Sequence, residues 1–128
     1  YFKFCVEREP VDKCLSYYFM RKNSPNSSYQ RKNMTWDEFV KKKRFPVDAS
    51  FYSHKGNLIV NKIVKYENLN EDLESLLKGL GVNNFKLTKK VNNKYREDDP
   101  YVSLEQKKII YQQFKPSLKF MKYDINQI

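Results

Sequence analysis

The sequence predicts a three-layer α/β fold with a parallel sheet, formed as one domain over residues 1–128. Two segments rich in aromatic and β-branched residues, 2–7 and 58–66, have the composition of buried strands. Segments with helical spacing of apolar residues follow each strand, and strands that alternate with helices favour a parallel sheet. Because two strands do not form a stable parallel sheet alone, we expect further strands from upstream sequence or from a partner chain.

The first strand, 2–7, is followed closely by Pro10, which cannot donate a hydrogen bond within a sheet. Asp12 is placed to cap a helix over 13–22. That segment repeats apolar residues at helical spacing. They are Cys14, Leu15, Tyr18 and Phe19.

Residues 23–33 are rich in Ser and Asn and predict a surface loop. Thr35 and Glu38 form a capping box for a short helix that ends at about Lys43. The segment 44–57 predicts irregular structure.

The second strand, 58–66, leads to Asn70, which is placed to cap a helix over 71–80. Gly81 marks the end of that helix, because glycine readily adopts the left-handed conformation found there. A basic, Asn-rich connection follows over 82–100.

Ser103 and Gln106 form a second capping box, for a last helix over 104–114. Pro116 interrupts this helix, and a short tail follows.

The chain has a net charge of +10, which favours polyanionic partners such as nucleotides, nucleic acid, acidic glycans or anionic lipid heads. The surplus comes from 20 lysines but only 5 arginines, as AT-rich coding would produce. The arginines are the more informative cations, because a guanidinium binds phosphate through two parallel hydrogen bonds and lysine does not. No apolar run approaches the roughly 20 residues that cross a bilayer.

Cys5 and Cys14 belong to no CxxC motif and to no Cys/His cluster. The sequence therefore predicts no metal site and no disulfide framework, and we expect both thiols to be buried. The chain opens on YFKFCV without an initiator Met, so we expect that upstream sequence is absent.

Arg8 and Ser16 are the first candidate ligand residues. Arg8 follows a predicted strand, and open parallel sheets bind ligands at the carboxyl ends of their strands. Ser16 lies in the helix that follows, whose amino end attracts anions. A guanidinium and a hydroxyl in this arrangement can converge on one phosphate.

The whole segment FCVEREPVDKCLSYY resembles the 3′-phosphate-binding motif of the PAPS-dependent sulfotransferases. That motif is a strand followed by Arg, with Pro and Asp shortly after it and Ser eight positions beyond the Arg. Arg8, Pro10, Asp12 and Ser16 match in place. The resemblance implies that Arg8 and Ser16 hold the 3′-phosphate of the donor.

A second match covers 59–80, IVNKIVKYENLNEDLESLLKGL, which is similar to the family's strand ending in Tyr-Glu-x-Leu and the helix after it. The resemblance places Tyr66 against the adenine of the donor, and a purine face stacks readily on an aromatic ring. For Glu67 we favour a structural role beside the helix.

A third match is Tyr95-Arg96, the helix after it and the ending FMKYD, which resemble the C-terminal region of carbohydrate-type and bacterial sulfotransferases. The family places a basic loop before this helix over the 3′-phosphate. The candidates are Lys89, Lys90, Lys94 and Arg96, with Lys94 and Arg96 assigned to the donor site.

The resemblance implies the C-terminal portion of a P-loop-like sulfotransferase fold. Such an enzyme transfers a sulfo group from PAPS to an acceptor hydroxyl or amine, here an anionic or carbohydrate acceptor, and releases PAP without a metal. The family's 5′-phosphosulfate loop and its catalytic base have no counterpart in these residues. We therefore expect the 128 residues to be inactive alone. His54 is the one histidine and a candidate base, although a lone loop histidine is more often structural or exposed.

Two other functions are open. One is a non-enzymatic basic module that binds nucleotides or nucleic acid, which would need aromatic and basic residues interleaved on one surface. The other is a P-loop kinase or a related nucleotide-binding protein. Two unpaired cysteines favour the cytoplasm, with the Golgi lumen as the alternative.

Overall fold

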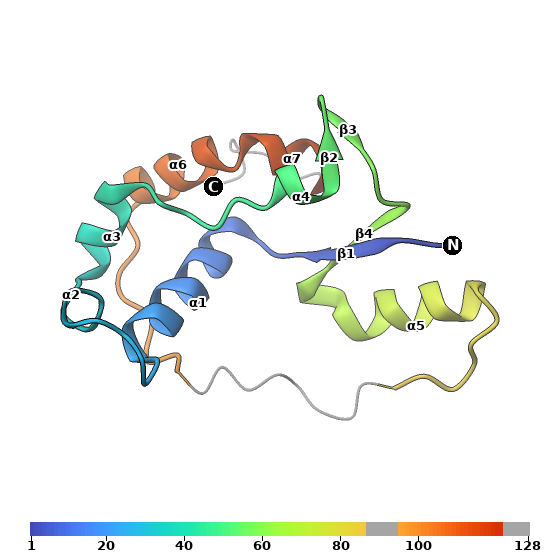
Figure 1. Cartoon of the computed structure of the whole chain (residues 1–128), viewed down its shortest axis with the longest axis horizontal. Helices are drawn as coiled ribbons and strands as arrows, with labels where there is room; N and C mark the ends of the chain where they lie inside the picture. Colours follow the sequence, from blue (N-terminus) through green and yellow to red (C-terminus); the bar gives the residue numbers. More distant parts are fainter. Residues whose placement is uncertain (87–94, 122–128) are drawn as a thin grey trace.

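A computed structural model describes residues 1–86 and 95–121 of the chain (Figure 1). The elements, in chain order, are β1 (Phe4–Glu7), α1 (Pro10–Asn23), α2 (Tyr29–Lys32), α3 (Trp36–Lys42), α4 (Ala49–Tyr52), β2 (Ser53–His54), β3 (Asn57–Leu58), β4 (Lys62–Lys65), the 3₁₀ helix η1 (Tyr66–Asn68), α5 (Leu69–Gly79), α6 (Leu104–Gln113) and α7 (Lys115–Met121). The predicted mixed α/β class with a parallel sheet is confirmed. Among the described helices, none is long and apolar enough to cross a bilayer.

The parallel sheet consists of β1 and β4, which are far apart in the sequence. Phe4 pairs with Lys62 and Glu7 pairs with Lys65. The residues that follow the two strands, Arg8 and Tyr66, therefore leave the sheet at the same edge, as the sequence predicts. The strands β2 and β3 form a separate antiparallel hairpin.

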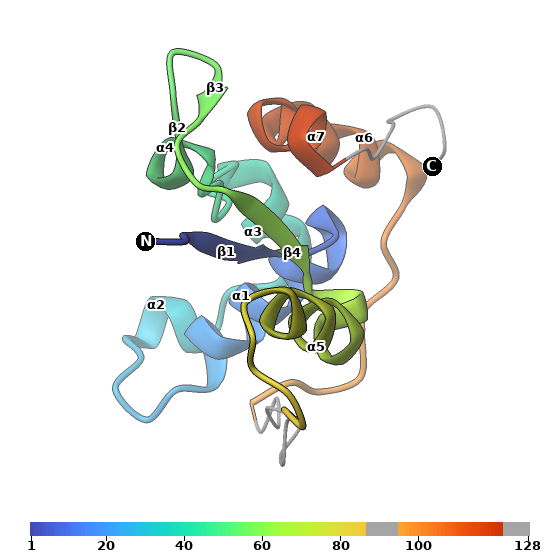
Figure 2. The same ribbon diagram turned by 90° about the vertical axis from the view of Figure 1, so that its right-hand side faces the viewer.

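Helices lie on both sides of this sheet. Both α5 and α7 contact β4. Figure 1 and Figure 2 show α5 on one side of the two strands and α7 on the other. The segment between β1 and β4 contributes α1 to α4. In Figure 1, α1, α2 and α3 extend beyond the carboxyl end of β1, whereas α4 lies next to β2.

The strands are shorter and less buried than predicted. In β1, Phe4 and Val6 are 41% and 45% exposed, whereas Glu7 is only 2% exposed. Because side chains alternate along a strand, one face of β1 meets the helices and the other stays open. The second predicted strand is broken into β3 and β4, with Val64 as the fully buried residue of β4.

The main core lies among the helices and not around the sheet. It is formed by side chains of α1, α3, α6 and α7. Its buried residues are Cys14, Leu15, Tyr18, Phe19, Trp36, Phe39, Val40, Ile110, Tyr111, Phe114, Leu118 and Met121. Aromatic rings dominate one end, where Trp36 stacks on Phe39 with ring centroids 5.4 Å apart. Cys14 is buried as predicted, whereas Cys5 is only partly buried.

Two segments predicted as irregular contain short helices. Ser28 accepts a hydrogen bond from the backbone N–H of Arg31 and so caps α2 within the predicted loop. The helix α4 lies within 44–57. After Phe114 the chain begins α7 in place of the predicted tail, because Pro116 falls in its first turn, where a missing N–H costs little.

Three predicted helix ends are confirmed. Ser103 and Gln106 form a complete capping box at the start of α6. Thr35 accepts a hydrogen bond from the Glu38 backbone at the start of α3. Gly81 has a φ of 89°, and the backbone N–H of Val82 donates to the carbonyl of Leu77, which closes the end of α5.

Candidate functional site

The turn from β1 into α1 positions the first candidate residue. Glu9, and not Asp12, caps α1: its carboxylate accepts hydrogen bonds from the backbone N–H groups of Val11 at 3.1 Å and Asp12 at 2.8 Å. The helix begins at Pro10, whose fixed φ suits the first helical position. The prediction of Asp12 as the cap was therefore wrong, and the side chain of Asp12 is available for other contacts.

Arg8 lies against Tyr66. The guanidinium carbon of Arg8 is 4.1 Å from the centroid of the Tyr66 ring. A guanidinium over an aromatic face is attracted by the ring's negative potential. The parallel register explains the contact, because Arg8 and Tyr66 each follow the last paired residue of adjacent strands.

Asp12 joins Arg8 to Arg96. Its carboxylate accepts hydrogen bonds from Nε of Arg8 and, at 2.8 Å, from Nη1 of Arg96. Arg96 also donates from Nε and Nη2 to the two oxygens of Asp99, both at 3.0 Å. Burial raises the pKa of Asp12, but the hydrogen bonds from Arg96 and Arg8 outweigh it and hold that pKa below its ordinary value.

Arg8 retains donors for a ligand. Its side chain is 15% exposed, and only Nε donates to another residue in the described part of the chain. The two terminal nitrogens carry four further N–H groups. These N–H groups can donate to two oxygens of one phosphate, as guanidinium groups commonly do.

Ser16 lies on the same side of α1 as Asp12, because residues four apart share a helix face. It is partly buried, and its hydroxyl forms no hydrogen bond with a described residue. No hydrogen bond joins its side chain to Arg8 within residues 1–86 and 95–121. Its assignment to the 3′-phosphate therefore stays a prediction.

The remaining candidates lie elsewhere. Lys94, together with Lys89 and Lys90, lies outside the described residues. His54 is exposed in the β2–β3 hairpin, which projects away from the carboxyl end of β1 (Figures 1 and 2). The structure thus brings Arg8, Tyr66 and Arg96 together but not His54.

A buried ionic network lies directly behind Arg8. The Glu7 carboxylate accepts hydrogen bonds from Nζ of Lys13 at 2.6 Å and from the Tyr52 hydroxyl at 2.8 Å. Lys13 also donates to Asp48 at 2.7 Å. Burial lowers the pKa of Lys13, but its hydrogen bonds to Asp48 and Glu7 outweigh it and raise that pKa overall. Burial and the neighbouring Glu7 raise the pKa of the Tyr52 hydroxyl.

This network ties the end of β1 to α1 and α4, so it holds the backbone of Arg8 in place. Sequence reasoning missed it. The one signal was a carboxylate inside an otherwise apolar strand, because buried carboxylates are rarely found without a partner. A related contact supports the structural role expected for Glu67, whose carboxylate accepts a hydrogen bond from the Glu9 backbone.

No group of three or more potential metal ligands occurs within the described ranges. Comparison with family models, with curated proteins and with solved structures finds no match to this chain. The function of the site must therefore follow from its own chemistry.

Proposed function

We propose that the chain binds the adenosine 3′,5′-bisphosphate portion of PAPS and forms the donor site of a PAPS-dependent sulfotransferase. The observation that carries this proposal is the contact between Arg8 and Tyr66 at the adjacent ends of two parallel strands. Ligands of open parallel sheets bind at such strand ends. A guanidinium for phosphate and an aromatic ring for a base stand side by side there.

The 3′-phosphate would bind the terminal nitrogens of Arg8, whose remaining side-chain nitrogen is oriented by Asp12. Arg96 shares the same carboxylate and adds a second positive charge beside the phosphate. Ser16 lies one turn beyond Asp12 and supplies a hydroxyl donor to the same anion. Together with Asp99, the two arginines and Asp12 carry no net charge, so the phosphate would bind largely through directed hydrogen bonds.

Tyr66 would carry the adenine. One face of its ring is covered by the Arg8 guanidinium. The purine would stack on the opposite face, so that Arg8 remains beside the ring and reaches the ribose phosphate. Stacking of this kind distinguishes poorly between bases, and the 3′-phosphate would then supply most of the specificity.

The reaction that we propose is transfer of a sulfo group to an acceptor hydroxyl or amine, with a carbohydrate as the acceptor class. A bond forms from the acceptor atom to sulfur, the bond from sulfur to the 5′-phosphate oxygen breaks, the acceptor proton passes to a base, and PAP leaves. Catalysis of such a step depends mainly on positioning and on cations around the transferring group. Groups for the 5′-phosphosulfate would come from an additional segment or a partner chain.

Calorimetry with PAP and with 5′-AMP tests the donor site. PAP should bind at least about tenfold more tightly, because charge-assisted hydrogen bonds to the additional phosphate are worth about 1.5–3 kcal/mol each. Arg8→Ala should abolish this preference, and Tyr66→Leu should weaken both nucleotides equally. The control is Lys41→Ala, which removes one positive charge from an exposed position of α3. It should leave the preference for PAP over 5′-AMP unchanged.

Equal affinity for PAP and 5′-AMP, or an unchanged preference in Arg8→Ala, would contradict the donor site. Tighter binding of duplex DNA than of PAP, insensitive to Arg8→Ala, would instead support the basic binding module. Sulfo transfer by these 128 residues alone would show that the transfer site is complete within them.

A further inference from the structure

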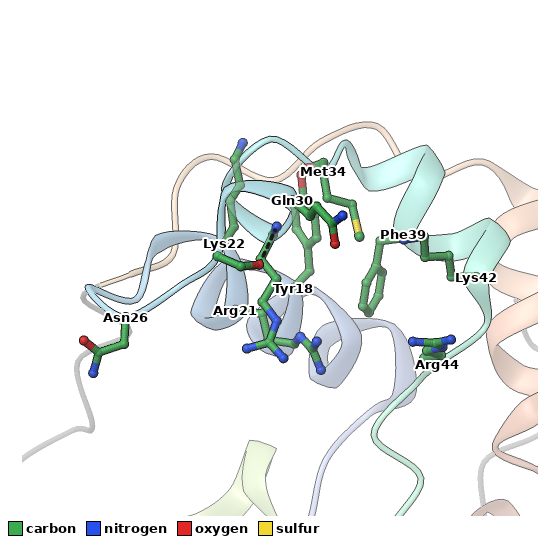
Figure 3. Close-up of a pocket in the computed structure, with 11 residues that line it drawn as sticks. Tyr18, Arg21, Lys22, Asn26, Gln30, Met34, Phe39, Lys42 and Arg44 are labelled. Atoms are coloured by element: carbon green, nitrogen blue, oxygen red, sulfur yellow. Dashed lines mark hydrogen bonds between the residues drawn. The ribbon is translucent and has the colours of Figure 1, made fainter.

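A second site of a different kind lies between α1, α2 and α3. It is a cavity of about 440 Å³ that opens beside the carboxyl end of α1 (Figure 3). The volume falls within the range of about 300–1,000 Å³ that is typical of small-molecule sites. None of its lining residues belongs to the site around Arg8.

The charged residues of this cavity are all cations. They are Arg21, Lys22, Arg31, Lys42 and Arg44. No carboxylate lines the cavity among the described residues. Lys22 approaches Glu97 at 4.0 Å, whereas the other four have no ion pair to any residue within 1–86 or 95–121. The five positive charges therefore repel one another around a shared space.

Helix ends alone do not account for this clustering. Cations are favoured in the last turn of a helix, which accounts for Arg21 and Lys22 in α1 and for Lys42 in α3. However, Arg31 belongs to α2, which has only four residues, and Arg44 lies outside α3. Figure 3 shows that Arg21 and Arg44 reach the same side of the cavity from different elements, whereas Lys22 points to the opposite side.

The interior of the cavity is less polar than its edge. Tyr18 and Phe39 belong to the buried core, and Met34 packs against them. The Tyr18 hydroxyl donates to the backbone carbonyl of Met34 at 2.7 Å, which leaves the ring itself as an apolar wall. Such a wall suits the body of an organic molecule, while the surrounding cations suit its charged groups.

We propose that this cavity binds a small organic molecule that carries two or more phosphate or sulfate groups. Guanidinium groups from separate elements can each bind one oxyanion through two hydrogen bonds, which a single inorganic anion would not satisfy. The cavity is a concave, partly open space of about 440 Å³ lined by three helices and the loops between them, a size that favours a compact ligand over a nucleic acid strand. The proposal does not rest on the donor site, because Arg8 and Tyr66 take no part in it.

Calorimetry with defined probes tests the cavity. The phosphate arm uses inositol hexakisphosphate, the sulfate arm uses sucrose octasulfate, and inorganic phosphate represents a single anion. We expect at least one of the two polyanions to bind at least about tenfold more tightly than inorganic phosphate. The double variant Arg21→Gln/Arg44→Gln should weaken that binding by at least about tenfold.

The matched control is Lys32→Gln/Lys41→Gln. It removes the same charge from exposed positions of α2 and α3 that do not line the cavity, so we expect a loss below about threefold. Arg21 donates to the Tyr17 hydroxyl at 2.5 Å, and its loss can also disturb α1. Arg31→Gln/Lys42→Gln is therefore the second test, since neither side chain contacts a partner in the described part of the chain.

Equal losses in the cavity variants and in the control would overturn the proposal and would assign the binding to the general basic surface. Tighter binding of a 12-base-pair DNA duplex than of both polyanions would overturn it as well. A preference for one polyanion identifies phosphate or sulfate as the group recognised. Chemical-shift changes in ¹⁵N spectra should centre on residues 28–34 and 42–44, and changes confined to Arg8 and Tyr66 would contradict the cavity.

Discussion

The guanidinium of Arg8 covers the ring of Tyr66 at 4.1 Å, although the two residues follow strands whose paired positions, such as Phe4 and Lys62, are far apart in the sequence. Neither residue belongs to the sheet itself. Each follows the last paired position of its strand, so the register of β1 and β4 alone brings them together. The strength of this contact therefore reports how firmly the carboxyl ends of β1 and β4 are held together in solution.

A double-mutant cycle tests the contact. Arg8→Ala and Tyr66→Leu should each destabilise the fold, and the double variant should lose less than the sum. We expect a coupling free energy of about 0.5–2 kcal/mol from urea unfolding, because the pair is partly buried. Strict additivity of the two changes would show that the two side chains do not meet.

The Asp12 carboxylate should make the stability of the fold depend on pH in the acidic range. Its pKa is depressed in the folded protein by Arg96 and Arg8, against the opposing effect of burial. A depressed carboxyl pKa contributes stability above the unfolded value of about 3.9, and that contribution is lost as pH falls towards the folded value. Unfolding by urea should therefore show a steeper loss of stability below about pH 4 for the wild type than for Asp12→Asn. Identical pH profiles would contradict the bridge.

Lys13 balances a carboxylate that is almost completely buried. Lys13→Met should leave the buried Glu7 side chain without its cationic partner, at a cost of about 3–5 kcal/mol in the free energy of unfolding. Adding Glu7→Gln should recover part of this loss, because the uncompensated charge is removed. Lys22→Met changes the same residue type on the same helix, where the ion pair spans 4.0 Å, and should cost no more than about 0.5 kcal/mol. Equal effects of the two lysine substitutions would refute the network.

Two glycines near the end of α5 should respond in opposite directions. Gly79 is helical, and an added Cβ would meet nothing within 4 Å. Gly79→Ala should therefore stabilise the fold by about 0.5–1 kcal/mol. Gly81 has a φ of 89°, so Gly81→Ala should destabilise it by about 1 kcal/mol or more. Thermal unfolding of the two variants measures the difference, and shifts of the same sign would place the end of α5 elsewhere.

The edge of the sheet was predictable from the sequence, but its ionic partners were not. Alternating strands and helices predict parallel strands, and parallel strands place Arg8 beside Tyr66. The prediction that Asp12 caps α1 was wrong, because the side chain of Glu9, directly before Pro10, accepts the backbone hydrogen bonds at the start of the helix. The pairing of Arg8 with Asp12 at a helical spacing of four residues was a usable signal, whereas the contact of Asp12 with Arg96 spans 84 residues.

The environment of Glu7 shows the same limit. A strand of aromatic and β-branched residues was expected to be buried throughout, yet Phe4 is exposed and Glu7 is enclosed. The partners Asp48 and Tyr52 come from a segment whose sequence predicts no regular structure. Only tertiary packing brings that segment to the end of β1, and local sequence patterns do not encode such packing.

The pairing of Phe4 with Lys62 has a consequence for folding kinetics. The chain between these two residues, which includes α1 to α4, must close into a loop, and this closure costs chain entropy before any sheet hydrogen bond forms. The aromatic cluster of α1 and α3, in which Tyr18 packs on Phe39, joins residues much closer in the sequence and should therefore condense first, and β4 should dock on β1 later. Substitutions at Val64 would then mainly accelerate unfolding, whereas substitutions at Phe39 would slow refolding. The edge that carries Arg8 and Tyr66 would therefore assemble after the α1–α3 cluster and open before it.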